Sequence, residues 1–100
     1  MNRASSERER LVARVNGREE LHDLVNQAVT RITERDGVQG VVDVVDPRLL
    51  VSVLAENGMV MGDGEVKPVY RAGKQYFQEM FWVRPRKRTS PVGFIILEDI

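Results

Sequence analysis

The sequence predicts a small α+β domain with three main helices, a small antiparallel sheet and a C-terminal β-hairpin. Three observations lead to this expectation. Apolar residues recur at helical spacing in two stretches, residues 18–32 and 68–81. A third stretch, residues 47–57, has helix-start and helix-stop residues at its ends. Runs rich in β-branched residues, at 38–44 and on both sides of residues 84–88, are typical of strands.

Length and composition indicate one folded domain. The chain has 100 residues, of which 42% are hydrophobic, and this suits a single modest core. We expect residues 1–5 to be a disordered start and residues 6–100 to form a single domain. There is no cysteine, which excludes disulfides and cysteine-based sites. No apolar stretch reaches the roughly 18 residues that span a bilayer, so we expect no membrane partner and a cytoplasmic protein, nuclear if its source is eukaryotic.

The first third of the chain predicts two helices. Ser6 with Glu9 has the pattern of a capping box, and a short helix would follow and end near Asn16 and Gly17. Asn16 can also cap the long helix 18–32, which Gly37 would end. The apolar residues that define the long helix are Leu21, Leu24, Val25, Ala28, Val29 and Ile32.

Residues 47–57 predict the second main helix. Asp46 can cap it, Pro47 suits its first position, and Asn57 with Gly58 suits a left-handed stop. The alternative is a hairpin turn at residues 46–48 with residues 49–55 as the return strand. We prefer the helix because both ends carry the appropriate residues. The next segment, residues 59–66, is expected to be a loop.

Residues 68–81 predict the third main helix, which Pro68 can start. Its apolar residues fit a period of 3.6 better than a period of 2. They are Val69, Tyr70, Tyr76, Phe77, Met80 and Phe81. A strand, a basic turn and a final strand then complete the C-terminal hairpin.

The order of these elements resembles that of the winged-helix superfamily. The resemblance implies a third helix that is presented outward and a final hairpin that forms the wing. It also implies DNA binding, with a role in the regulation of transcription. The expected contacts are Arg71, Lys74, Gln75 and Gln78 on one stripe of the helix, and Arg84, Arg86, Lys87 and Arg88 on the wing. Residues 65–90 hold seven basic and two acidic side chains, so an anionic partner should meet this half.

The alternative function is a non-catalytic protein-interaction module, or a structural subunit of a larger assembly such as a virion component. Met59 and Met61 with Trp82 would then supply an apolar contact, although we prefer to place Met59 at the helix stop and Trp82 in the core. The segment GVQGVVDVVD resembles the first strand of roadblock-type dynein light chains. That resemblance implies a dimerising scaffold, with a homodimer as the assembly, and requires residues 49–55 to be the next strand.

Catalysis has little support in the sequence. His22 is the one histidine, and Asp43 and Asp46 have no histidine or cysteine companion. Residues 62–64, Gly-Asp-Gly, lack the pattern of a phosphate-binding loop and suit a flexible turn. We therefore expect no enzyme activity, no metal and no cofactor.

Overall fold

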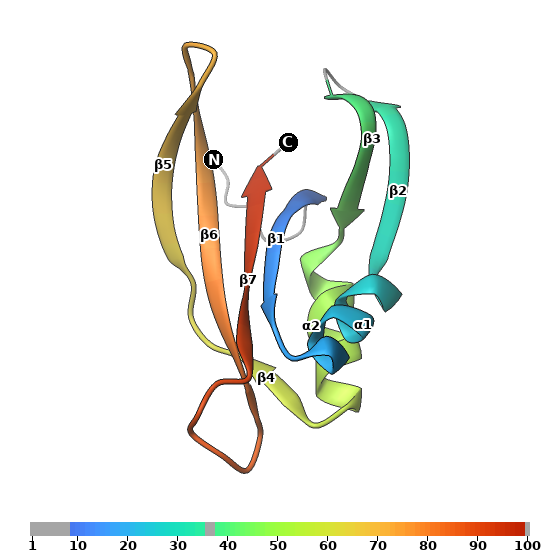
Figure 1. Ribbon diagram of the computed structural model, residues 1–100, viewed down its shortest axis with the longest axis vertical. Helices are drawn as coiled ribbons and strands as arrows, with labels where there is room; N and C mark the ends of the chain where they lie inside the picture. Colours follow the sequence, from blue (N-terminus) through green and yellow to red (C-terminus); the bar gives the residue numbers. More distant parts are fainter. Residues whose placement is uncertain (1–8, 36–37, 100) are drawn as a thin grey trace.

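A curled antiparallel sheet with two helices on one face makes up the fold (Figure 1). The computed structural model describes residues 9–35 and 38–99. The elements are β1 (Arg10–Gly17), α1 (Glu19–Gln27), β2 (Val29–Arg35), β3 (Val38–Val45), α2 (Pro47–Glu56), β4 (Met59–Met61), β5 (Glu65–Arg71), β6 (Lys74–Pro85) and β7 (Gly93–Asp99). The expected architecture of three main helices with a small sheet is therefore wrong.

The sheet has the strand order β2-β3-β1-β7-β6-β4, and β5 also pairs with β6. Because β3 is antiparallel to both β1 and β2, these two strands run parallel with β3 between them. The segment β1-α1-β2 is thus a split β-α-β unit. After β3 the chain passes through α2 to β4, at the opposite edge of the sheet. The later strands β6 and β7 lead back toward β1, so that β7 lies between β1 and β6.

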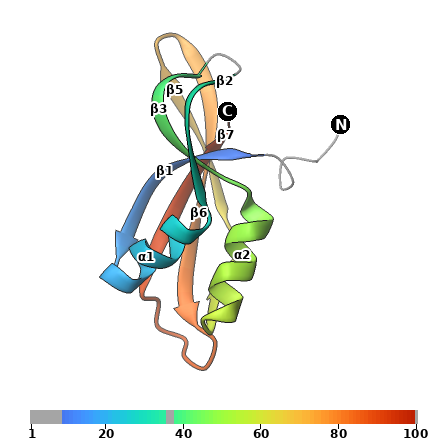
Figure 2. The ribbon, with the colours of Figure 1, turned by 90° about the vertical axis from the view of Figure 1, so that its right-hand side faces the viewer.

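The core lies between the sheet and the two helices, which Figure 2 shows on the same side of the molecule. The helices contribute Leu21, Val25, Leu50 and Leu54, and the sheet contributes Val45, Val83, Ile95 and Leu97. All eight side chains are at most 1% exposed. Burial of a leucine or valine side chain of this kind stabilises the fold by about 1.5–3 kcal/mol. None of the helices among the described residues is long and apolar enough to cross a membrane.

Three expected elements are confirmed. The strand at 38–44 is β3, the helix at 47–57 is α2, and the C-terminal hairpin is formed by β6 and β7. The side chain of Asp46 accepts a hydrogen bond of 2.9 Å from the backbone N–H of Arg48, and Gly58 is left-handed with φ of 74°. Both end signals of α2 therefore act as expected. The strand that the roadblock resemblance requires at residues 49–55 belongs to this helix.

The short first helix is wrong, because residues 10–17 form β1. The register of β1 against β7 shifts between Val12 and Arg14, as in a β-bulge. The extra residue puts Val12 and Val15 on the same face, and both pack against the core. Their spacing of three residues imitated a helix. Ser6 of the expected capping box and the expected disordered start at residues 1–5 lie outside the described residues.

The long helix 18–32 is right in its first part and wrong in its second. Helix α1 ends at Gln27, and Val29 and Ile32 belong to β2, which pairs with β3. The segment that starts at Val29 is rich in β-branched residues, which favour strands. Gly37, the expected stop, lies outside the described residues.

The third helix is also wrong, because residues 68–81 belong to the hairpin of β5 and β6. The turn of this hairpin consists of Ala72 and Gly73, whose φ angles are 49° and 79°. Two central residues with positive φ are characteristic of the type I′ turn. The element order on which the winged-helix resemblance rests is therefore not the order of the described elements.

Candidate functional site

The eight residues predicted to contact nucleic acid do not share one surface. The turn of the β5–β6 hairpin lies at one end of the molecule and the turn after β6 at the other (Figure 1). Strand β6 has 12 residues, so its ends are roughly 36 Å apart at about 3.3 Å per residue. Lys74 and Gln75 therefore lie far from residues 84–88, and the expected joint surface is wrong.

Because residues 68–81 belong to β5 and β6, the predicted stripe of polar side chains along one face of a helix does not form. Lys74 and Gln75 are neighbours in a strand, so their side chains point to opposite faces. Gln78 donates a hydrogen bond of 3.0 Å to Oε1 of Glu98, which is a contact within the sheet. Arg71 is the last residue of β5. Its side chain is outside the described part of the structure, so its predicted contact with nucleic acid stays a prediction.

The basic turn, residues 84–88, contains two arginines that hold its own shape. Nη1 of Arg84 donates to the carbonyl oxygens of residues 85, 86 and 88, at 3.3, 3.3 and 3.0 Å. Nη2 of Arg86 donates to the carbonyl of Ala55 in the last turn of α2, at 2.9 Å. Its cation thus lies at the negative end of the helix dipole, where positive charge is favourable.

Lys87 and Arg88 are the two remaining cations of the basic turn. Both are exposed, and within the described residues neither side chain makes a hydrogen bond or an ion pair. Together with Gly58, Pro85 and Arg86 they line a hollow of about 330 Å³. Two arginines therefore fix the backbone of the basic turn, and a lysine and an arginine offer their charges to solvent.

Trp82 lies on the sheet face opposite the helices, which we call the outer face. Its strand neighbours Phe81 and Val83 pack in the core, so Trp82 and Arg84 point the other way. Trp82 is 46% exposed, and the expectation that it belongs to the core is wrong. Met59, in contrast, is 8% exposed and part of the core, so it is not the exposed contact of the alternative function; it follows directly on the end of α2 at Asn57 and Gly58.

Trp82 has an aromatic neighbour that the sequence analysis did not connect with it. The cross-strand partner of Trp82 is Phe94 on β7, and the two rings meet edge to face with centroids 5.3 Å apart and planes at 73°. The guanidinium carbon of Arg14, on β1, lies 5.8 Å from the centre of the Phe94 ring, within range of a cation–π interaction. We use the name aromatic-basic patch for Trp82, Phe94 and Arg14 together with Lys87 and Arg88 of the basic turn that follows β6.

Other charges on the outer face are of both signs. Lys67 and Glu65 lie on β5 opposite Gln78 and Met80, and both are exposed. Glu98 is 3% exposed and is engaged by Gln78. Among the described residues, Arg14, Lys67 and Arg84 of this face stand against the exposed Glu65.

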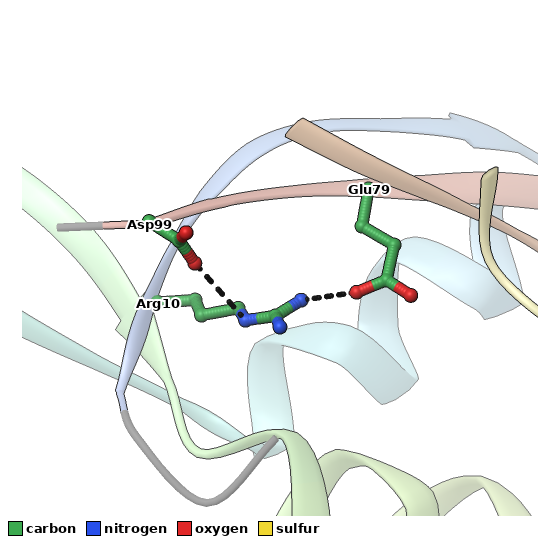
Figure 3. A network of polar contacts seen from close by, with 3 residues as sticks. All are labelled: Arg10, Glu79 and Asp99. Carbon is green, nitrogen blue, oxygen red and sulfur yellow. Dashed lines mark hydrogen bonds and ion pairs between the residues drawn. The ribbon is translucent and has the colours of Figure 1, made fainter. Parts of the chain in front are cut away.

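A separate ion-pair network lies on the helix side of the sheet (Figure 3). Arg10 extends between two carboxylates, with Nη1 2.6 Å from Oε1 of Glu79 and Nε 3.5 Å from Oδ1 of Asp99. The side chain of Arg10 is 8% exposed and that of Glu79 24% exposed. Because Arg10 joins β1 to β6 and β7, the network is a structural tie across the sheet.

A pocket of about 380 Å³ lies beside this network and is lined by Pro47, Val51, Met61 and Phe81 together with Arg10, Arg48 and Glu79. Its walls are mainly apolar. No group of three or more histidine or acidic residues that could hold a metal ion occurs in the described part of the chain. His22 is exposed on α1, away from the patch.

Comparisons with known proteins add no assignment: no family model matches the sequence, no curated protein matches it, and no solved structure matches the fold.

Proposed function

We propose that this protein binds nucleic acid through the aromatic-basic patch. The observation that carries the proposal is Trp82, a half-exposed indole beside a second aromatic ring, at the end of the sheet that leads to two unpaired cations. Proteins that bind single-stranded nucleic acid stack aromatic side chains on the bases and place positive charges beside the phosphates. The proposal no longer involves Lys74, Gln75 or Gln78.

The roles within the patch follow from the contacts. Lys87 and Arg88 are available to neutralise phosphates, which releases counterions and makes binding salt-dependent. Arg84 and Arg86 fix the turn that presents them, through hydrogen bonds to four carbonyl groups. A fixed turn loses little conformational entropy on binding. Phosphate contacts of this kind serve DNA and RNA alike. We propose that the protein binds nucleic acid in the cytoplasm, or in the nucleus of a eukaryotic cell, and that a regulatory role depends on this binding.

The first test reverses the two exposed charges of the basic turn. We expect Lys87→Glu with Arg88→Glu to weaken the binding of a labelled oligonucleotide by at least about tenfold at low salt. The slope of log K against log salt concentration should become shallower by about 2, since two phosphate contacts are lost. Fluorescence anisotropy over a series of salt concentrations measures both quantities. Arg86 is left intact because its loss would also remove the hydrogen bond to Ala55.

The matched control reverses two exposed charges elsewhere, Lys74→Glu at the hairpin turn with Arg48→Glu on α2. It has the same net charge as the test variant, so an effect of overall charge would appear in both. Equal weakening by the two variants would contradict a local site. If the unaltered protein binds no oligonucleotide at low ionic strength, the alternative of a protein-interaction module or structural subunit replaces the proposal.

A further inference from the structure

The two flanks of Trp82 differ in the residues that lie opposite it. On one side of β6 its neighbour is Phe94. On the other side the backbone N–H of Gly62 donates to the carbonyl of Trp82 at 2.8 Å, and glycine has no side chain to cover the ring. The indole therefore has an aromatic ring on one flank, and on the other flank the residue directly opposite it has no side chain; 46% of Trp82 stays exposed.

Phe94 is less suited to receive a ligand. It is only partly exposed, and its ring already has the guanidinium of Arg14 within 5.8 Å. The two aromatic planes are also inclined at 73°, so a single flat ligand cannot lie against both. Trp82 is thus the ring whose surface is available to a ligand. Phe94, which has Arg14 over its own ring, supports Trp82 from one side.

The strand around Trp82 is held on both edges. Its own carbonyl accepts from Gly62, and the carbonyl of Val83 accepts from the backbone N–H of Val92 at 2.8 Å. A ligand that stacks on Trp82 therefore meets a preorganised surface, and little has to be ordered when it binds.

We infer that Trp82 stacks on one unpaired base and that the ligand is single-stranded nucleic acid. This inference rests on the proposed function. A base within a duplex is already stacked between its neighbours, and its face is open to a protein side chain only when it is unpaired or flipped out. We expect the neighbouring phosphates to meet Lys87 and Arg88, the exposed cations of the turn that follows β6.

The test uses the fluorescence of Trp82, which is the one tryptophan of the chain. The protein is titrated with a single-stranded oligothymidylate, with a duplex of the same length, and with inorganic polyphosphate, which carries charge but no bases. We expect the single strand to quench the fluorescence and to bind at least about tenfold more tightly than the duplex. Polyphosphate should leave the fluorescence unquenched, because it has no base to stack on the indole; quenching by polyphosphate would contradict stacking.

Two variants separate stacking from charge. Trp82→Leu should weaken single-strand binding about tenfold to a hundredfold in anisotropy measurements and leave the salt slope unchanged, because no cation is lost. Trp82→Phe should restore most of the affinity, since an aromatic plane is retained. Circular dichroism and thermal melting check that both variants fold, which the exposed position of Trp82 favours.

The outcomes distinguish this inference from the function on which it rests. If single strand and duplex bind equally and both depend on Lys87 and Arg88, the protein binds nucleic acid but the stacking inference is wrong. If Trp82→Leu binds the single strand as tightly as the unaltered protein, the inference is likewise wrong. If neither polymer binds, the proposed function fails as well.

Discussion

Arg10 and Arg31 make the same kind of ion pair in different surroundings. Nη1 of Arg10 lies 2.6 Å from Glu79, and Nε of Arg31 lies 2.7 Å from Asp43. The side chain of Arg10 is 8% exposed, whereas that of Arg31 is 72% exposed. Solvent screens the second pair, and exposed pairs of this type contribute about 0–1 kcal/mol. Loss of one partner from a buried pair costs much more, because the other charge is left without compensation.

We therefore predict that Arg10→Met lowers the free energy of unfolding by about 1–3 kcal/mol. The substitution removes the cation from the carboxylate of Glu79, whose side chain is 24% exposed, whereas Asp99, at 49% exposed, stays solvated. The matched variant, Arg31→Met, should cost less than about 1 kcal/mol. Urea denaturation of both variants at neutral pH gives the comparison, and similar losses in the two would contradict the role assigned to the network.

At the scale of elements, the β5–β6 hairpin explains why much of the fold could not be predicted from the sequence. Its turn is Ala72-Gly73, whereas the usual signal of a type I′ turn is Asn-Gly or Asp-Gly. Strand β6 also has apolar side chains on both faces, with Phe77 and Phe81 toward the helix side and Met80 and Trp82 toward the outer face. The period of 2 that marks a half-buried strand is therefore absent, and a helical period fitted better.

The elements predicted correctly have local signals that agree with their packing. Helix α2 has both its cap and its stop encoded in adjacent residues, and β3 is rich in valine, a β-branched residue. The candidate site was predicted only in part. The basic turn is visible in the sequence, but the partnership of Trp82 with Phe94 and Arg14 depends on which strands are adjacent and in which register. Such information is contained in tertiary structure and not in local spacing.

The turn of the same hairpin gives a prediction at this scale. Ala72 has φ of 49°, a left-handed conformation that costs a residue with a Cβ roughly 1 kcal/mol. Asparagine tolerates this region better, so we expect Ala72→Asn to stabilise the protein by a few tenths to about 1 kcal/mol.

The complementary substitution, Gly73→Ala, should destabilise the protein by about 1 kcal/mol, because the φ of Gly73 is 79°. Thermal melting followed by circular dichroism measures both changes. Opposite signs are expected for the two variants. A loss of stability in Ala72→Asn would show that the turn is not of the assigned type.

At the scale of the whole molecule, the two faces of the sheet have different roles. One face packs against α1 and α2 and contains the core and the Arg10 network. The other face is open to solvent around Trp82 and leads to the basic turn at one end of a molecule 41 Å long. The chain has equal numbers of basic and acidic residues, 15 of each, so its net charge does not reveal that cations gather in the basic turn. Association with an anionic chain should therefore depend on the local patch and not on net charge.

The most direct measurement is an NMR titration of the isotopically labelled protein with a short single-stranded oligonucleotide. If the outer face binds the ligand, we expect the indole N–H of Trp82 to shift most, together with the backbone amides of residues 82–84, 87–88 and 93–95. The amides of α1, α2 and the Ala72-Gly73 turn should remain in place. Shifts confined to the helices or to the β5–β6 hairpin turn, with the indole signal unchanged, would contradict the assignment of the outer face as the contact surface.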